Sequence, residues 1–259
     1  MRRLLVLLLL VTLGGCATTG ARDPRDPYEG FNRGVWAFNQ AVDKAAIKPA
    51  TVVYRTVTPV PARRGITRIF ANLAEPFSAV NNMLQGKPKR ALNSLGRFLI
   101  NTTIGVGGLA DHATSLGLPE TREDFGQTLG AWGATRSPYL VLPLLGPSTI
   151  RDGVGQAVQI FADPAQIAVN SELSGTAETA MTVTRVIDQR SQAIESGVDR
   201  VIADAADPYA TARSTYLQRR DFLIRDEAGA GTEGEDPDDL LNKALEEETG
   251  QVVDPPQED

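Results

Sequence analysis

The stretch that decides the fold runs from Pro88 to Asn101 and reads PKRALNSLGRFLIN. Its apolar and polar residues recur at the spacing of the helical turn, so they separate onto two sides of one helix. The apolar side holds Ala91, Leu92, Leu95, Phe98 and Leu99, and the polar side holds Arg90, Asn93, Ser94, Arg97 and Asn101. Proline suits the first position of a helix, where its missing N–H is not needed. The stretch therefore predicts an amphipathic helix over residues 88–101.

The same spacing continues on both sides of this helix. It predicts helices that begin at Glu29, at Pro61, after a cap at Ser148 and at Asp207-Pro208, and a long helix over 177–205. Pro76 predicts the start of a further short helix, which Gly86 ends. The sequence contains no convincing series of strands and no internal repeat. We therefore predict an all-α body without a substantial β-sheet.

Two apolar segments do not fit regular helices. The segment 102–109 contains three glycines, and the segment 138–147 contains three prolines. These residues oppose a stable helix, and the prolines also oppose a central strand. Both segments are hard to place in water and too short to span a bilayer, so they suit a membrane interface or protein packed at membrane depth. A buried loop of a soluble domain is the alternative.

The N-terminus has the features of an export signal. Arg2 and Arg3 precede an apolar run over residues 4–13, which is the length of a signal-peptide core and about half of a membrane-spanning helix. The run ends in Leu13-Gly14-Gly15-Cys16, which resembles the bacterial lipobox, although Gly14 stands where Ala or Ser is more usual. Because Cys16 is the only cysteine, we predict lipid attachment at Cys16 rather than a secretory signal with an incidental cysteine.

The chain divides into four predicted parts. They are a signal peptide over 1–15, a tether over 16–26, a helical domain over 27–227 and an acidic tail over 228–259. Residues 226–259 hold 13 acidic residues and one basic residue, whereas residues 16–225 carry a net charge of +4. The composition of the tail predicts disorder.

Several kinds of chemistry are excluded by composition and motif. The net charge of -6 argues against a general nucleic-acid binder. One cysteine and one histidine leave no Cys- or His-based metal cluster. The sequence lacks Gly-x-Ser-x-Gly, His-Glu-x-x-His and the P-loop, and its glycines at 105–108 lack the strand and spacing of a dinucleotide-binding turn. We therefore predict no enzyme activity, no metal and no cofactor.

Eleven short strings of characteristic residues follow one another between residues 26 and 225. They are Asp26–Arg33, Phe38-Asn39, Asn72-Leu73-x-Glu75-Pro76, Asn81 with Leu84-Gln85-Gly86, Arg97-Phe98-x-x-Asn101-Thr102-x-Ile104-Gly105, Gly107-Gly108-x-x-Asp111, Asp124–Gly130, Pro138-Tyr139, Pro143-x-x-Gly146-Pro147-Ser148, Arg151-Asp152 and Asp207-Pro208-Tyr209. In this order they resemble the VacJ/MlaA family of outer-membrane lipoproteins. No single string is decisive, but their common order is specific.

The resemblance implies an all-helical ring that lies in the inner leaflet of the outer membrane of a Gram-negative bacterium. An amphipathic channel through the ring would carry misplaced phospholipid from the outer leaflet toward the periplasm. A periplasmic lipid carrier would then deliver it to an inner-membrane ABC-transporter complex, and the ring would associate with a trimeric porin. Ala17 fits the outer membrane, because an aspartate there would resemble an inner-membrane retention signal.

The candidate channel and gate residues lie in two regions. The first is the pair Phe38-Asn39, where a deletion would rotate the following helix by about 100° per residue. The second holds the polar side of the 88–101 helix and the glycine bend after it. Its candidates are Arg97, Phe98, Asn101, Gly105, Gly107 and Gly108, with Arg90 or Arg97 as a partner for lipid phosphate.

Two alternatives to this interpretation remain open. From the residues alone, the 88–101 helix is better explained by packing its leucines into an ordinary core with Arg97 in water. A structural or adhesive envelope lipoprotein is the alternative function, and a lipid-active hydrolase is a distant third.

Replacing Cys16 by alanine should block lipidation and outer-membrane placement. The reason is that one anchor is lost, and a surface patch by itself binds membranes reversibly. Fractionation of the envelope and complementation of a deletion strain measure the effect. Full complementation by Cys16→Ala would show that the lipid anchor is dispensable.

Overall fold

A computed structural model describes residues 23–165, 167, 171 and 175–225 of the chain. The predicted signal peptide, Cys16 and the acidic tail lie outside these residues. The first half contains α2 (Glu29–Val42), the π-helical segment η2 (Asp43–Ile47), α3 (Lys48–Val57), α4 (Val60–Leu84), α5 (Pro88–Thr103) and α6 (His112–Ser115). The second half contains α7 (Phe125–Ala131), β1 (Tyr139–Leu142), β2 (Gly146–Thr149), α8 (Ile150–Ala162), α10 (Gly175–Glu195), α11 (Val198–Asp204) and α12 (Pro208–Arg225).

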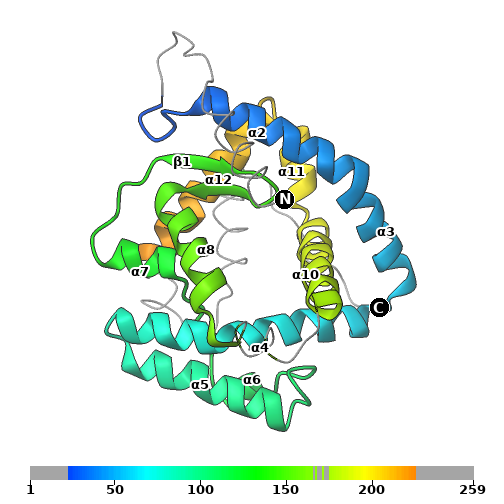
Figure 1. Cartoon of the computed structure of the whole chain (residues 1–259), viewed down its shortest axis with the longest axis vertical. Coiled ribbons are helices and arrows are strands. Elements are labelled where there is room, and N and C mark those ends of the chain that lie inside the picture. The colour runs from blue at the N-terminus through cyan, green and yellow to red at the C-terminus, as the bar shows by residue number, and fades with distance from the viewer. Residues whose placement is uncertain (1–22, 166, 168–170, 172–174, 226–259) are drawn as a thin grey trace, which may run out of the picture.

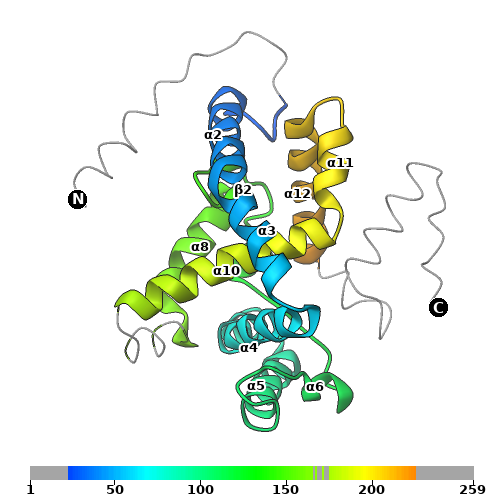
Figure 2. The same ribbon diagram turned by 90° about the vertical axis from the view of Figure 1, so that its right-hand side faces the viewer.

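The elements form a ring around a central opening (Figure 1). Going round it, α2 leads through η2 and α3 to α4, and α4 contacts α7, which packs on α8. The strand β2 contacts α8, and β1 contacts α2, so the ring closes on itself. The helix α10 lines the opening beside α3, and α5 and α6 lie outside α4 (Figures 1 and 2). The predicted all-α ring is confirmed.

The interface between α4 and α5 is polar. Arg97 on α5 donates to Glu75 on α4 at 2.7 Å, in an ion pair whose two side chains are both buried. Asn72 donates to Thr102 at 2.8 Å, one turn further along the same interface. Arg97 also bonds Asp111, which caps α6 by accepting from the Thr114 amide. Burial raises the pKa of Glu75, and Arg97 opposes that shift.

The apolar side of α5 faces outward as a consequence. Leu92 is 67% exposed and Leu99 61% exposed, whereas Arg97 is only 4% exposed. The helix over 88–101 is thus confirmed, but its orientation corrects the expectation of leucines in a core with Arg97 in water. Burying these side chains is tolerated because Arg97, Glu75 and Asn72 each form at least one hydrogen bond, although Glu75 Oε2 and Asn72 Oδ1 have no partner among the described residues. Exposing leucines suits an apolar environment outside the ring.

No helix in the described part of the chain combines enough length with enough hydropathy to cross a bilayer.

The helix α4 continues through Pro76, which corrects the prediction that a new helix starts there. Proline removes one intrahelical hydrogen bond, so such a helix needs support from its surroundings. That support lies on both sides of Pro76, where Glu75 bonds Arg97 and the Ser78 hydroxyl lies 3.4 Å from that of Ser94. Packing on α5 therefore supports a continuous helix through the proline.

The segment 138–147, expected to be irregular, forms most of a two-stranded antiparallel hairpin. Its prolines are compatible with strands because both strands of such a sheet are edges. Pro147 pairs with Val141 and needs no N–H on its open side. The following helix α8 is capped by Thr149, which accepts from the Asp152 amide, rather than by the predicted Ser148.

The long helix predicted over 177–205 is interrupted. Gly197 has a φ of 76°, a left-handed conformation that ends α10 and opens α11. Glycine adopts this conformation without a steric cost, so it allows the chain to turn between the two helices.

A small aromatic core closes the ring at the hairpin. The rings of Tyr139 and Tyr209 meet edge to face with centroids 6.1 Å apart, and Trp36 meets Tyr209 at 6.2 Å. The Tyr209 hydroxyl donates to the buried carboxylate of Asp26 at 2.5 Å, and Asn32 donates to the same carboxylate at 2.7 Å. The start of α2, the strand β1 and α12 are thereby joined.

Replacing Arg97 by leucine should lower the free energy of unfolding by about 3–5 kcal/mol, because Glu75 loses its buried partner. The double variant Arg97→Leu with Glu75→Leu should lose less stability than Arg97→Leu, since it also removes the unpaired Glu75 carboxylate. Denaturant unfolding in detergent micelles measures the difference, with the exposed Arg136→Leu as control. Equal losses for Arg97→Leu and Arg136→Leu would contradict a stabilising buried pair.

Candidate functional site

The candidate site is a cavity of about 190 Å³ between α4, α8 and α10. The face of α4 that lines it is a different one from the face packed on α5. Its lining residues are Thr67, Phe70, Ala71, Leu73 and Ala74 of α4, Arg122, Gln159 of α8, Asp163 just after α8, and Arg185, Asp188, Gln189 and Gln192 of α10. The cavity therefore joins an apolar wall to a concentration of charged and amide side chains.

Asp188 fixes α10 to the neighbouring helices. Its buried carboxylate accepts from Tyr54 of α3 at 3.2 Å and from Thr67 of α4 at 3.0 Å. Gln192 donates to it at 2.8 Å. Burial and the charge of Asp188 raise the pKa of Tyr54 to about 12, so the phenol stays protonated and donates. Asp188 thus has a structural role at the cavity wall.

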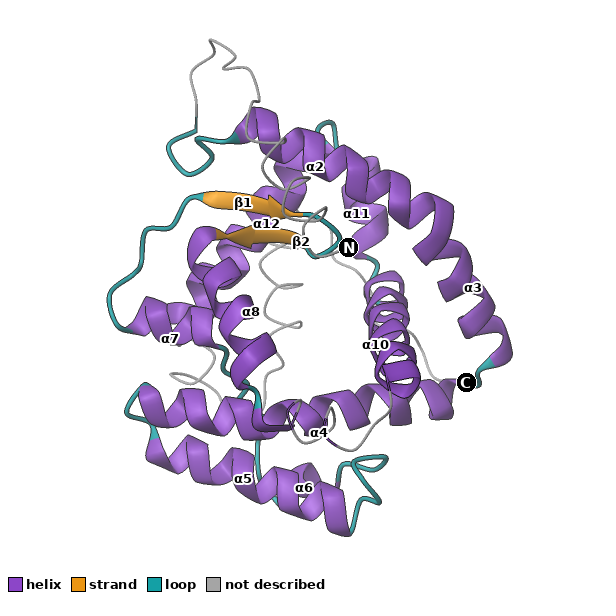
Figure 3. Cartoon of the chain, viewed as in Figure 1, coloured by secondary structure: helices purple, strands orange, loops and turns teal. Residues whose placement is uncertain are grey.

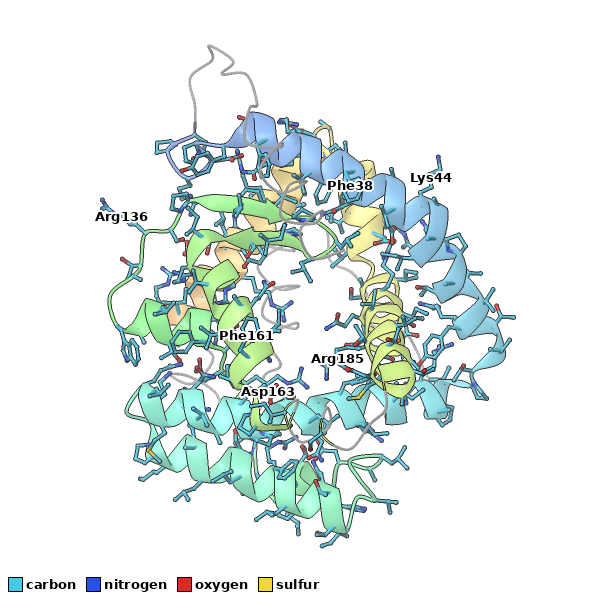
Figure 4. The ribbon with its side chains drawn as sticks, in the orientation of Figure 1. Phe38, Lys44, Arg136, Phe161, Asp163 and Arg185 are labelled. Atoms are coloured by element: carbon cyan, nitrogen blue, oxygen red, sulfur yellow. The ribbon has the colours of Figure 1, made fainter. Side chains whose placement is uncertain are left out.

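Asp163 and Arg185 border the central opening from its two sides, α8 and α10 (Figure 4). The guanidinium of Arg185 lies over the ring of Phe70, with its carbon 5.0 Å from the ring centroid. Burial lowers the pKa of Arg185, and the charge of Asp163 opposes that shift. A cation is therefore held at the cavity by an aromatic face.

The last turn of α8 adds apolar surface beside these charges. Ile160 is exposed, and Phe161 is 81% exposed at the edge of the opening (Figure 4). An opening with both apolar and charged groups at its edge can accommodate an amphipathic molecule.

Of the sequence-predicted residues, Phe38 and Asn39 lie on α2 against the hairpin. Asn39 donates to the Leu142 carbonyl at 2.9 Å and accepts from the Leu144 amide at 2.8 Å. Its single amide thus bonds both sides of the hairpin turn, where Leu144 has a φ of 65°. The hairpin tip lies beside α2 at the edge of the opening (Figure 3), and Phe38 is half exposed next to Asn39.

The other predicted residues lie together at the opposite end of the ring, near α5 and α6. Asn101 accepts from the amides of His112 and Ala113, at 2.9 and 3.0 Å, and so shapes the start of α6. A Cβ on Gly105 would lie 2.3 Å from the Ala110 carbonyl oxygen, and one on Gly108 would lie 2.7 Å from Asn72. The remaining members of this group are Arg97, Phe98 and Gly107.

The structure therefore places the two predicted channel and gate regions far apart. The helix α2 and the α5–α6 corner lie at opposite ends of the molecule (Figures 1 and 2). Because α4 lies between α5 and the opening, Arg97 and Asn101 support the wall from outside rather than line the opening.

Sequence reasoning missed Arg185 and Asp163. A signal was present in α10, where Arg185, Asp188, Gln189 and Gln192 recur at helical spacing between apolar residues. Nothing local indicated that this polar stripe faces a cavity, since α4 and α8 are distant in sequence. Within the described residues, no group of three His, Cys, Asp or Glu residues could hold a metal ion.

Comparison with known proteins gives concordant matches. The family model described as MlaA lipoprotein matches residues 24–223. The intermembrane phospholipid transport system lipoprotein MlaA of Escherichia coli K12 is 36% identical over an alignment of 228 residues, and the match covers 85% of this chain and 88% of that protein. Its namesake in Haemophilus influenzae is 32% identical over 250 residues, covering 93% of this chain and 97% of that protein.

A solved structure described as "Structural basis for maintenance of bacterial outer membrane lipid asymmetry" is also similar to this chain. The TM-score is 0.66 at 36% identity, and the match covers 78% of this chain and 100% of the other.

Replacing Asn39 by leucine should free the hairpin turn, because the Leu142 carbonyl and the Leu144 amide both lose their partner. Hydrogen exchange of the Leu144 amide should accelerate about tenfold. Each of the two lost hydrogen bonds is worth about 1 kcal/mol, and bonds to water replace part of that loss. The neighbouring, exposed Gln40→Leu serves as control. Unchanged exchange at Leu144 in Asn39→Leu would show that other contacts hold the turn.

Proposed function

This chain belongs to the MlaA lipoprotein family, and on that premise we propose that it transports phospholipids between membranes and maintains the lipid asymmetry of the outer membrane. A phospholipid misplaced in the outer leaflet enters the central opening of the ring and leaves toward the periplasm. The ring provides a path for the lipid and makes no covalent change to it.

The observation that carries this proposal is the distribution of polarity in the ring. Leu92 and Leu99 on α5 are exposed on the outside, where α5 packs its polar side on α4. At the opening, Arg185 and Asp163 border a cavity whose other wall is apolar. Acyl chains require apolar surroundings, and a phosphate headgroup requires charged partners, so this distribution suits a phospholipid.

The location of the ring follows from the family and from the N-terminal sequence. We propose that Cys16 is acylated and anchors the chain on the periplasmic side of the outer membrane of a Gram-negative cell. The outward leucines of α5 would lie in the inner leaflet. A trimeric porin would hold the ring, and a periplasmic lipid carrier would take the lipid to an inner-membrane ABC-transporter complex.

The hairpin is proposed as the gate. Its tip has only a three-residue turn, Pro143 to Leu145, and its two leucines are exposed. Asn39 bonds this turn, so a deletion at 38–39 would remove the bond and rotate the rest of α2. We therefore assign gating to Phe38, Asn39 and the hairpin, and a supporting role to the glycine corner at 105–108.

Plugging the cavity should stop transport. Ala74→Trp adds bulk at the cavity wall, whereas Ala50→Trp adds it on an exposed position of α3. Each variant is expressed in a deletion strain, from which the chromosomal copy of the gene has been removed. Outer-leaflet phospholipid is labelled from outside with a membrane-impermeant amine reagent, and detergent sensitivity is measured in parallel.

The wild-type chain and Ala50→Trp should keep outer-leaflet phospholipid low, and Ala74→Trp at equal protein level should raise it toward the deletion strain. A deletion strain with normal lipid asymmetry would overturn the proposed function. Normal asymmetry with Ala74→Trp, in a background where the deletion strain loses it, would instead show that the lipid does not pass through this cavity.

A further inference from the structure

Arg185 differs from four other arginines whose side chains are mostly buried. Arg63, Arg97, Arg190 and Arg220 each donate to at least one carboxylate at 2.6–2.9 Å. Over residues 23–165 and 175–225, the guanidinium of Arg185 has no hydrogen bond and no ion pair, and its contact is the face of Phe70. Its N–H donors, five in a guanidinium, are therefore available to a ligand.

The surroundings of Arg185 favour an anion. The guanidinium is partly buried, and a buried cation without a bonded counter-ion is costly. Asp163 lowers this cost through its charge but forms no ion pair with Arg185. Arg122, which is paired with Glu120, adds a second cation to the same cavity wall.

The geometry of a guanidinium suits a phosphate. Its fork of N–H groups binds two oxygens of a phosphate or carboxylate at once. Gln159 and Gln189 also line the cavity, and their side-chain amides can donate to further oxygens. The cavity, at about 190 Å³, is smaller than the sites of drug-sized ligands, so it suits a headgroup rather than a whole lipid.

Apolar surface continues from the cavity toward the opening. Phe70 and Leu73 form part of the wall, and the exposed Ile160 and Phe161 lie on the adjoining turn of α8. A ligand whose phosphate meets Arg185 would therefore have apolar contacts for an attached acyl chain.

We propose that Arg185 binds the phosphodiester of a phospholipid headgroup in the cavity between α4, α8 and α10. This inference rests on the proposed function and adds to it a fixed stopping place for the lipid on its way through the ring. The Phe70 ring keeps the guanidinium extended along the wall before the lipid arrives, which limits the entropy lost on binding.

The test measures binding of a soluble phospholipid to the full chain in detergent micelles. Dihexanoylphosphatidylglycerol is the probe, and broadening of its phosphorus resonance gives the affinity. Arg185→Met should weaken binding about tenfold or more, because a charge-assisted, two-point contact is lost. Arg185→Lys keeps the positive charge but lacks the forked guanidinium, so its affinity should lie between those of the wild type and Arg185→Met. Arg136→Met, on an exposed loop, is the control and should bind as the wild type does.

Two further probes identify the source of the phosphate. Dihexanoylglycerol, which has no phosphate, should bind equally to wild type and Arg185→Met. Inorganic phosphate should compete only weakly, since it lacks the apolar contacts. Equal competition by phosphate would overturn a lipid site in favour of a free-phosphate site.

Two results separate the failure of this inference from that of the proposed function. Wild-type and Arg185→Met chains that bind the phospholipid equally would overturn the role of Arg185 alone. A folded wild-type chain that binds no phospholipid would overturn both.

Discussion

The buried ion pair between Arg97 and Glu75 sets which side of α5 faces outward and which face of α4 is left for the opening. Because this pair and the bond from Asn72 to Thr102 join α5 to α4, the polar side of α5 is turned inward. Leu92 and Leu99 are then left outside, an arrangement that water disfavours and a lipid leaflet favours. The same guanidinium reaches Asp111, so the corner that follows α5 is fixed by it as well.

The arrangement of the rest of the ring depends on α5 packing against the outer side of α4. Since α5 covers one face of α4, the face with Thr67, Phe70 and Ala74 is left to line the opening. The helix α10 is tied to this face through Asp188, and Arg190 binds Asp43 and Asp199 with both arms of its guanidinium. These bonds occupy the side chains of Asp188 and Arg190 on α10. They leave the Arg185 guanidinium available to bind a ligand at the cavity.

The opposite end of the ring is closed by contacts between segments far apart in sequence. Asp26 meets Tyr209 across 183 positions, and Asn39 meets Leu142 across 103. A hairpin of two short edge strands is only marginally stable alone, so it depends on α2 and α12 for its position. Such an element can move when one side-chain contact is lost, which is what the proposed gate requires.

The sequence by itself determined the helical class, the span of α5 and the family, because periodicity and motifs are local properties of the chain. Lipid attachment at Cys16 stays a prediction from the sequence. It was wrong at Pro76, where support from α5 outweighs the missing hydrogen bond, and at Gly197, whose turn splits a periodic run. Only the tertiary structure decided which side of α5 faces inward, that Asn39 bonds the hairpin and that Arg185 faces a cavity. Periodicity divides a helix into two sides, but the partners and the surrounding medium decide which side is buried.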